Sequence, residues 1–378
     1  MKIHIKESSL KGADVIIIFS SANVPLGKFT GSNLFGDEWN RVYINTEDND
    51  WYLRGMNGDL GIDDIDSLSI YISSIVKKLV GNSTGCKTVF FGSSMGAFGA
   101  LLYGLKCNAD YIIAFGAEIT LGRKGGFFER ECKVQNELVN VKPELQKLIN
   151  DNERSQIHLF SGENNSLDTL FLAELNDSKK LKRYSVINAE HVVVKELQID
   201  VGIKNLIEDI VYDKKDLINQ VSNGFLFNFP DIAKALYLFD YQSKDSSDLR
   251  SILSAHNLPN HIKSYVYRRL ALSSEKDKDH YSMAAYNLNK VCGKNAIIYA
   301  RTLIKMKKYK EALYILRPIA ETASIDIGKP FFQAFTLLLD AAKILKNDNV
   351  YQYYFFRALE VLKDNENLQN KLIKKYGK

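Results

Sequence analysis

One serine of this chain stands in a sequence context suited to nucleophilic catalysis. Residues 92–96, Gly-Ser-Ser-Met-Gly, follow a β-branched and aromatic run and precede an amphipathic stretch of small residues. A strand, a tight turn and a helix in that order form a nucleophile elbow, which raises the serine hydroxyl above the edge of a sheet. Gly92 and Gly96 leave room for the turn. The pattern predicts that Ser94 carries an acyl group during catalysis.

A base and an acid follow the serine along the chain. Asp168 and Glu163 lie in the loop after one predicted strand, and His191 lies in the loop after the next. Serine, acid, histidine is the order of the α/β-hydrolase triad. We expect His191 to accept the proton of Ser94 and the acid to fix the imidazole tautomer. Asp168 is our first choice for the acid and Glu163 the second, although Asp168 before an apolar run also fits a helix N-cap.

Backbone N–H groups near the serine are candidates for binding an oxyanion. Met95 opens the predicted helix, whose N-terminus directs N–H groups at developing negative charge. Ser21 lies in the loop after an early strand, the position from which hydrolase-like folds supply a second N–H. A simple connecting turn is the alternative for Ser21.

Two loops contain candidates for substrate contact. Trp51, Tyr52 and Arg54 share a long loop, where exposed aromatic rings beside an arginine would form a pocket wall. Buried packing of both rings is the alternative. Arg123 lies in a polar loop at the predicted sheet edge, where it would meet an anionic substrate or donor; solvation of the loop is its alternative.

The strands that would position these residues are short and mostly apolar. Continuously apolar, β-branched runs are typical of parallel strands buried on both faces. A helical period over 65–80 leads into the strand before Ser94. We therefore predict an α/β domain over residues 1–212, an α/β-hydrolase-like, mostly parallel sheet with flanking helices. Its strands are expected at 1–7, 14–19, 41–45, 88–91, 109–116, 156–162 and 184–187.

Strand signals stop after residue 201, and helical periodicity continues to the end of the chain. Paired helices with small loops, and the segment 308–313, resemble tetratricopeptide-type repeats. We predict an all-α helical-hairpin domain over 213–378. Such stacks present a concave surface, which would bind a protein partner or a second copy of the chain.

Composition limits the class of protein. A length of 378 residues suits two domains, and no apolar stretch approaches the roughly 20 residues of a membrane helix. The N-terminus lacks the apolar core of a signal peptide. The four cysteines show no metal-ligand spacing. We expect a cytoplasmic protein, or one peripheral to the inner membrane, without a metal or a nucleic-acid partner.

Charge is divided unevenly along the chain. Residues 1–200 hold 22 Lys and Arg against 26 Asp and Glu, a balance of −4, and the remainder holds 28 against 19, a balance of +9. A basic second half attracts polyanions or anionic membrane surfaces. A Lys-rich solvated helical surface is the alternative.

The first ~200 residues, an ordinary domain length, resemble α/β-hydrolase-like proteins of bacterial capsule and surface-glycan biosynthesis, including capsular polysaccharide O-acetyltransferases. The resemblance rests on segments 91–96, 102–104 with 109–116, and 51–55, and on His191. Ala97 stands where a glycine is more usual. The resemblance implies acetyl-CoA as acyl donor, an acyl-enzyme on Ser94, and transfer to a hydroxyl of an anionic polysaccharide or its precursor. It does not cover the helical half.

Two other functions share these sequence features. A carbohydrate or lipid esterase would use the same residues and differ only in passing the acyl group to water. A non-catalytic scaffold of a glycan-biosynthesis complex would use the helical half alone, but a relic has no reason to keep serine, acid and histidine in order.

Overall fold

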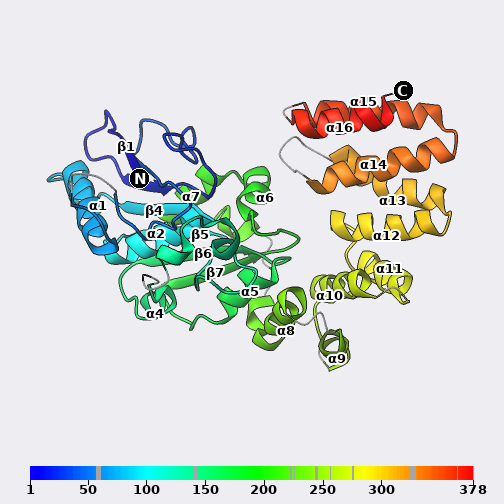
Figure 1. Cartoon of the computed structure of the whole chain (residues 1–378). Helices are drawn as coiled ribbons and strands as arrows, with labels where there is room; N and C mark the ends of the chain where they lie inside the picture. The colour runs from blue at the N-terminus through cyan, green and yellow to red at the C-terminus, as the bar shows by residue number, and fades with distance from the viewer. Residues whose placement is uncertain are drawn as a thin grey trace. The chain divides into compact units, whose positions relative to one another are not determined.

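The computed structural model divides the chain into two compact units, Met1–Ser243 and Lys244–Lys378 (Figure 1). The division falls beyond the expected boundary at 212 and 213. Helix α8 (Pro230–Tyr241) packs against α5 (Ser166–Ala173), and the Ser166 hydroxyl donates to Asp240 at 2.6 Å. These contacts place α8 in the first unit. The structure describes residues 1–56, 61–138, 141, 143–221, 224, 226–242, 246–255, 257–274, 276–322, 329–363 and 365–377.

The first unit is built on a seven-stranded sheet in the order β1-β3-β2-β4-β5-β6-β7. Strand β1 runs antiparallel to β3, and every other neighbouring pair is parallel. The mostly parallel sheet predicted from the apolar runs is thus confirmed. Its strands are β1 (Lys2–Lys6), β2 (Val15–Phe19), β3 (Asn40–Asn45), β4 (Thr88–Ser93), β5 (Tyr111–Phe115), β6 (Gln156–Gly162) and β7 (Leu181–Val186).

Both faces of the sheet are buried. Val15, Ile17 and Phe19 of β2 enter the core on one face, and Ile16 and Ile18 enter the core on the other. This alternation gives a parallel strand its continuously apolar sequence. The remaining helices of this unit are α1 (Ile65–Val80), α2 (Met95–Lys106), α3 (Phe127–Glu131), α4 (Leu145–Asn150), α6 (Val193–Asp200) and α7 (Ile203–Val211), and its 3₁₀ turns are η1 (Gln135–Glu137), η2 (Ile218–Gln220) and η3 (Leu226–Asn228).

Helix α1 shows how local sequence sets these elements. Asp64 and Ser67 form a capping box at its N-terminus, which satisfies two backbone donors that have no intrahelical acceptor. Leu68, Ile72 and Ile75 lie on one buried face, as helical spacing requires. The helix therefore delivers the chain to β4, the strand that ends at the candidate nucleophile.

The described residues of the second unit are helical, as predicted. Each helix from α10 to α15 packs against the next, and α10 contacts α12, α12 contacts α14, and α14 contacts α16. An apolar core runs between α12 and α16, with buried residues from Ala296 to Tyr376. The helices are α9 (Ser247–Ala255), α10 (Asn260–Ser273), α11 (Lys278–Leu288), α12 (Gly293–Lys305), α13 (Tyr309–Thr322), α14 (Lys329–Ile344), α15 (Asp348–Val361) and α16 (Glu366–Tyr376).

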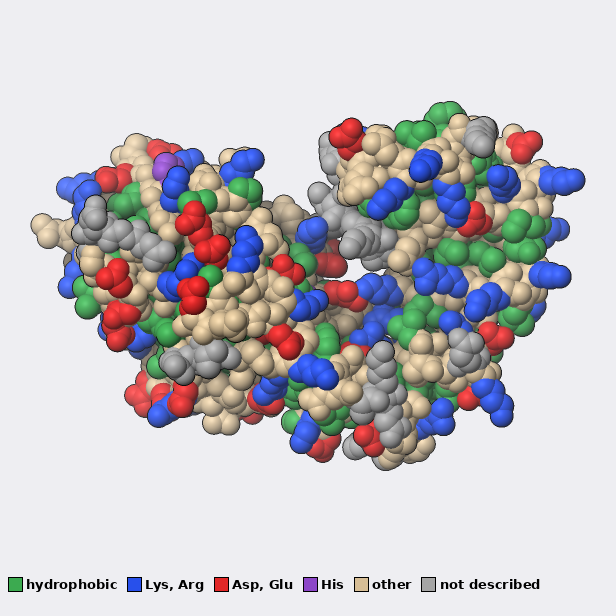
Figure 2. Space-filling view, viewed as in Figure 1, with side chains coloured by type: hydrophobic (Ala, Val, Ile, Leu, Met, Phe, Trp, Pro, Cys, Tyr) green, Lys and Arg blue, Asp and Glu red, His purple; other side chains and the backbone are tan. Residues whose placement is uncertain are grey.

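Figure 2 shows the Lys and Arg side chains of the second unit spread among acidic and apolar ones on the face drawn. None of the helices described is both long and apolar enough to cross a membrane.

Candidate active site

Ser94 stands between β4 and α2 in a strained backbone conformation. Its φ is 56° and its ψ is −121°, a region that non-glycine residues occupy only when the surroundings impose it. A Cβ on Gly92 would lie 2.1 Å from the carbonyl oxygen of Gly96, and one on Gly96 would lie 2.2 Å from that of Phe19. Both glycines are therefore required by close backbone contacts, as expected for a nucleophile elbow.

The structure brings Ser94, His191 and Asp168 together. The Oγ of Ser94 is 2.8 Å from Nε2 of His191, whose Nδ1 is 2.8 Å and 3.1 Å from the two carboxylate oxygens of Asp168. Asp168 is 3% exposed and His191 is 6% exposed. With the carboxylate at Nδ1, the proton resides there, and Nε2 is left to accept the Ser94 proton. This is the geometry of a general base aligned on a nucleophile.

The choice between the two candidate acids is decided by what each contacts. Asp168 lies within α5, and the N-cap of that helix is Asn165, whose side chain accepts from the N–H of Leu167 and Asp168. Asp168 is therefore not the cap, and its carboxylate is left to contact His191. Glu163 accepts the N–H of Leu226 at 3.1 Å instead.

The imidazole of His191 is held on its flat side as well as at its two nitrogens. The Phe127 ring stacks on it with centroids 3.8 Å apart and planes 17° apart. The guanidinium of Arg130 lies 4.1 Å from the centre of the Phe127 ring. Gly116, with φ of 61°, lies so close that a Cβ there would be 2.5 Å from the His191 carbonyl oxygen. Strand β5 and helix α3 thus enclose the base.

Glu118 is a buried carboxyl beside this group. It is 2% exposed, and its Oε2 accepts the backbone N–H of Phe128 at 2.7 Å. Its Oε1 is buried with no hydrogen-bond partner among the described residues. Burial raises the pKa of Glu118 to about 7, the charge of Asp168 adds to this, and the Phe128 N–H and His191 oppose it. The sequence pattern singled out Arg123 in the loop after β5, but neither Glu118 nor Phe127 was predicted as a site residue.

The two backbone N–H groups that we expected to bind the oxyanion, those of Met95 and Ser21, differ in whether they already have an acceptor. Met95 is the first residue of α2, so its N–H lies in the first turn, where no intrahelical carbonyl accepts it. Ser21 donates its N–H to the Thr30 hydroxyl at 3.1 Å, which corrects our expectation that this N–H is available. The Ser21 hydroxyl donates to the carbonyl of Ser93 at 3.0 Å and so ties its loop to the elbow.

Trp51 and Tyr52 do not form the wall of an open pocket. Both are completely buried, and both have positive φ, 54° and 63°. The Tyr52 hydroxyl donates to the carbonyl of Ser20 at 2.6 Å, and Tyr103 donates to the carbonyl of Tyr52 at 2.6 Å. The alternative of buried packing therefore holds, and this loop supports the backbone at Ser20 and Ser21.

The two arginines expected to bind substrate are engaged in ion pairs within the protein. Arg54 lies 2.9 Å from Asp48, 3.4 Å from Asp50 and 3.3 Å from Glu137. Because Asp50 is buried, this cation offsets a carboxylate that cannot reach water.

Arg123 pairs with Glu174 at 2.8 Å. Its guanidinium also lies 5.2 Å from the centre of the Phe171 ring. The charge of Arg123 is thus neutralised by Glu174 and its guanidinium packs on an aromatic ring. Arg123 therefore has structural contacts within the protein.

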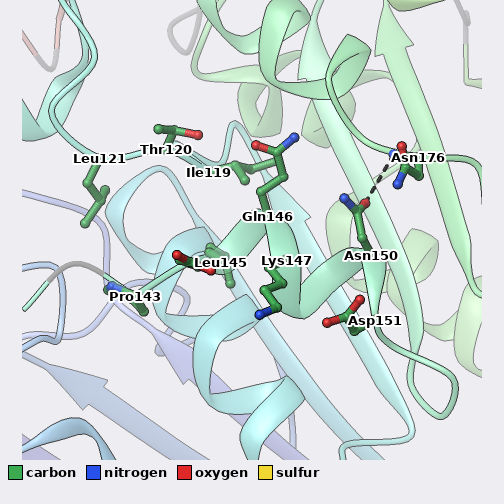
Figure 3. A pocket seen from close by; sticks show the side chains of 11 residues that line it. Ile119, Thr120, Leu121, Pro143, Leu145, Gln146, Lys147, Asn150, Asp151 and Asn176 are labelled. Atoms are coloured by element: carbon green, nitrogen blue, oxygen red, sulfur yellow. Dashed lines mark hydrogen bonds between the residues drawn. The ribbon is translucent and has the colours of Figure 1, made fainter.

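A pocket of about 560 Å³ opens beside the loop that follows Glu118. Figure 3 shows Gln146, Lys147 and Asn150 of α4, and Asp151 directly after it, along one side of the pocket, with Asn150 accepting the N–H of Asn176. Residues 119–121 line the pocket as well, but Ser94, His191 and Asp168 do not. The pocket is therefore separate from the candidate catalytic residues. Within the described residues, no cluster of three His, Cys, Asp or Glu side chains is arranged to hold a metal.

No family model matches the chain, and no curated protein matches it. The interpretation of the site accordingly depends on its own geometry, a buried acid, an oriented imidazole and a strained serine.

Proposed function

We propose that this protein is a serine-dependent acyltransferase that forms an acyl-enzyme on Ser94. The observation that carries the proposal is the continuous contact from Asp168 through His191 to Ser94, with 2.8 Å on each side of the imidazole. A structural hydroxyl needs neither a buried acid behind its histidine nor a strained backbone. Catalytic nucleophiles need both, because proton removal and exposure of Oγ must be arranged before the substrate binds.

The geometry supports a two-step exchange. In the first step Ser94 Oγ attacks the acyl carbonyl of a thioester or ester while His191 Nε2 takes its proton. The tetrahedral intermediate collapses, the bond to the leaving group breaks, and the imidazolium returns that proton to the departing thiolate or alkoxide. In the second step an acceptor hydroxyl gives its proton to His191 and attacks the acyl-serine. The ester of the acceptor forms, and the proton returns to Ser94.

Charge in each intermediate is balanced within the protein. Asp168 stabilises the imidazolium, and we assign the N–H of Met95 at the start of α2 to the oxyanion, because a helix N-terminus favours negative charge. A second oxyanion donor is needed from a residue other than Ser21.

The identities of donor and acceptor come from the resemblance to capsular polysaccharide O-acetyltransferases. On that basis the donor substrate is acetyl-CoA and the acceptor is a hydroxyl of an anionic bacterial polysaccharide or its precursor. The elbow, the order of the triad and the mostly parallel sheet support an α/β-hydrolase-like fold for the first unit. Contacts of each helix with the next and the next but one support tetratricopeptide-like hairpins in the second, which we assign to binding a partner or the glycan. A cytoplasmic location stays a prediction.

The test is intact-mass measurement of the full chain after incubation with acetyl-CoA. Wild type should gain one acetyl group and Ser94→Ala should gain none. Ser93→Ala is the matched control, because Ser93 precedes the nucleophile and is buried in β4. It should be acetylated like wild type.

A second substrate separates the rival activities. Turnover of p-nitrophenyl acetate to free acetate alone, unchanged by oligosaccharides, would identify an esterase. Transfer of labelled acetyl to an anionic oligosaccharide would identify the transferase. Absence of both an adduct and any ester turnover would refute serine acyl chemistry.

A further inference from the structure

Helix α3 has a specific relation to the base of the triad. Phe127, its first residue, lies flat against the imidazole of His191 at 3.8 Å, and its second, Phe128, is buried against Trp51 with ring centroids 5.2 Å apart. One short helix thus contributes one ring to the core and one to the active site. The position of the Phe127 ring in the active site depends on how firmly the helix itself is held.

Glu118 is the group that holds the helix start. Its Oε2 accepts the Phe128 N–H at 2.7 Å, inside the protein. A Cβ on Gly126 would lie 2.1 Å from Glu118 Oε1, so the chain entering α3 is closely packed on this carboxyl. A buried carboxyl that accepts a backbone N–H is a strong anchor for a helix of only five residues.

The hydrogen bonds of His191 do not by themselves fix the plane of its ring. Asp168 binds one nitrogen and Ser94 binds the other, so the two bonds lie at opposite edges of the imidazole. The ring can still roll about the line that joins them. Rolling tilts the Nε2 lone pair away from the Ser94 proton, and a flat ring stacked on the imidazole opposes that motion. Stacked aromatic rings attract each other beyond the effect of burial alone.

We propose that Phe127 and Glu118 are positioning residues of the acyl-transfer site. Glu118 fixes the start of α3, and Phe127 fixes the plane of the His191 imidazole so that Nε2 faces the Ser94 hydroxyl. The proposal rests on the function proposed above for Ser94. It gives α3 a role in catalysis, where a merely structural role would require only that the helix cover the core.

The test uses full-length Phe127→Leu, Glu118→Gln and Glu118→Ala. Leucine removes the flat ring and keeps apolar bulk, glutamine keeps an acceptor oxygen, and alanine removes it. Glu129→Ala is the matched control, because Glu129 also accepts a backbone N–H, that of Gly125 at 2.7 Å, and is exposed. It has no contact with His191 among the described residues.

Two readouts are taken on each variant. The acylation burst with p-nitrophenyl acetate, a small neutral ester, reports alignment of the base without contacts to a large substrate. Proton NMR of the histidine ring reports the stack directly, because Phe127 shifts the His191 ring protons upfield.

We expect Phe127→Leu and Glu118→Ala to lower the burst rate by up to about 10²-fold, the cost of a small misplacement, with KM little changed. The upfield signal should be lost in both. Glu118→Gln should retain most of the rate and the signal, and Glu129→Ala all of both.

A wild-type burst rate in Phe127→Leu, or a retained upfield signal with a reduced rate, would overturn the proposal. So would an equal loss in Glu129→Ala, since that identifies general loosening of the loop. Failure of the wild type itself to gain an acetyl adduct or to turn over the ester refutes the acyl chemistry instead. The NMR signal then still tells whether Phe127 and Glu118 hold the ring.

Discussion

Replacing Glu118 by glutamine should change how the stability of the first unit depends on pH. The carboxyl is buried, and its pKa is raised from 4.5 to about 7 by that burial. The folded chain therefore binds a proton more tightly than the unfolded chain does. Between these two pKa values folding takes up a proton, so the free energy of unfolding falls as pH rises through this window. Well below pH 4.5 the carboxyl is protonated in both states, so the free energy of unfolding no longer changes with pH through this group.

The size of the effect follows from the two pKa values. One pKa unit corresponds to about 1.4 kcal/mol. Between pH 5 and pH 8 the linkage relation lowers the free energy of unfolding of the wild type by about 2.5 kcal/mol. Glutamine does not titrate, so the Glu118→Gln variant lacks this loss. Relative to wild type, Glu118→Gln should therefore be more stable at pH 8 than at pH 5 by about that amount.

Urea denaturation followed by tryptophan fluorescence measures this in the full chain. Both tryptophans, Trp39 and Trp51, are buried in the first unit, so the signal reports that unit alone. Glu129→Gln, which changes an exposed carboxyl of α3, is the matched control.

The charges of Asp168 and His191 also act on Glu118. Repeating the series in a His191→Gln background separates the contribution of Glu118 from that of the neighbouring imidazole. A difference that is flat with pH, or that increases toward acid, would refute the reasoning from burial.

Three further predictions test other parts of the site. Asp168→Asn should lower the acylation rate by about 10⁴-fold, since the wrong imidazole tautomer results, while the urea midpoint stays near that of wild type; a loss of less than tenfold would contradict the assignment. Gly96→Ala should destabilise the first unit by about 1–3 kcal/mol in the same fluorescence assay and abolish acetyl labelling, and a wild-type midpoint would show that the elbow relaxes freely. Arg54→Met leaves the buried Asp50 unpaired and should cost about 1–3 kcal/mol; unchanged stability would mean that this ion pair contributes nothing.

Local sequence was sufficient wherever the signal spans a few residues. The elbow around Ser94 needs only a strand, two glycines and a helix in order, and each is encoded within a short segment. His191 was found from its order after Ser94 and the acid, and loops that follow parallel strands meet at one sheet edge. The same rule could have found Glu118, which follows β5 at that edge, but a lone carboxyl among polar residues carries no sign of its burial.

Long-range packing decided what the sequence left open. Asp168 and Glu163 both follow β6 within a few residues, and their order along the chain does not distinguish them. The Glu163 carboxylate accepts the N–H of Leu226, and a Cβ on Gly224 would lie 1.9 Å from it. The residues around Glu163 in the sequence do not predict a contact with Leu226, 63 positions later in the chain.

The loop at 51–54 misled for a related reason. Aromatic rings beside an arginine suit a ligand pocket, and they equally suit a buried loop whose backbone must be held in an unfavourable conformation. Trp51 and Tyr52 have positive φ, which costs roughly 1–3 kcal/mol each and persists only when surrounding contacts impose it. The hydroxyls of Tyr52 and Tyr103 supply such contacts, and burial of the rings supplies the rest.

These corrections redirect the search for the acceptor-binding residues. Arg54 and Arg123 are each paired with carboxylates of the protein, so a substrate anion would have to displace a partner to reach either. Exchanging one carboxylate for another gains little, because the ion pair lost offsets the one formed. Arg130 differs, since its guanidinium lies on the outer face of Phe127, the ring stacked on His191. Recognition of an anionic acceptor is therefore better sought around α3 than in the loops at 51–54 and 123.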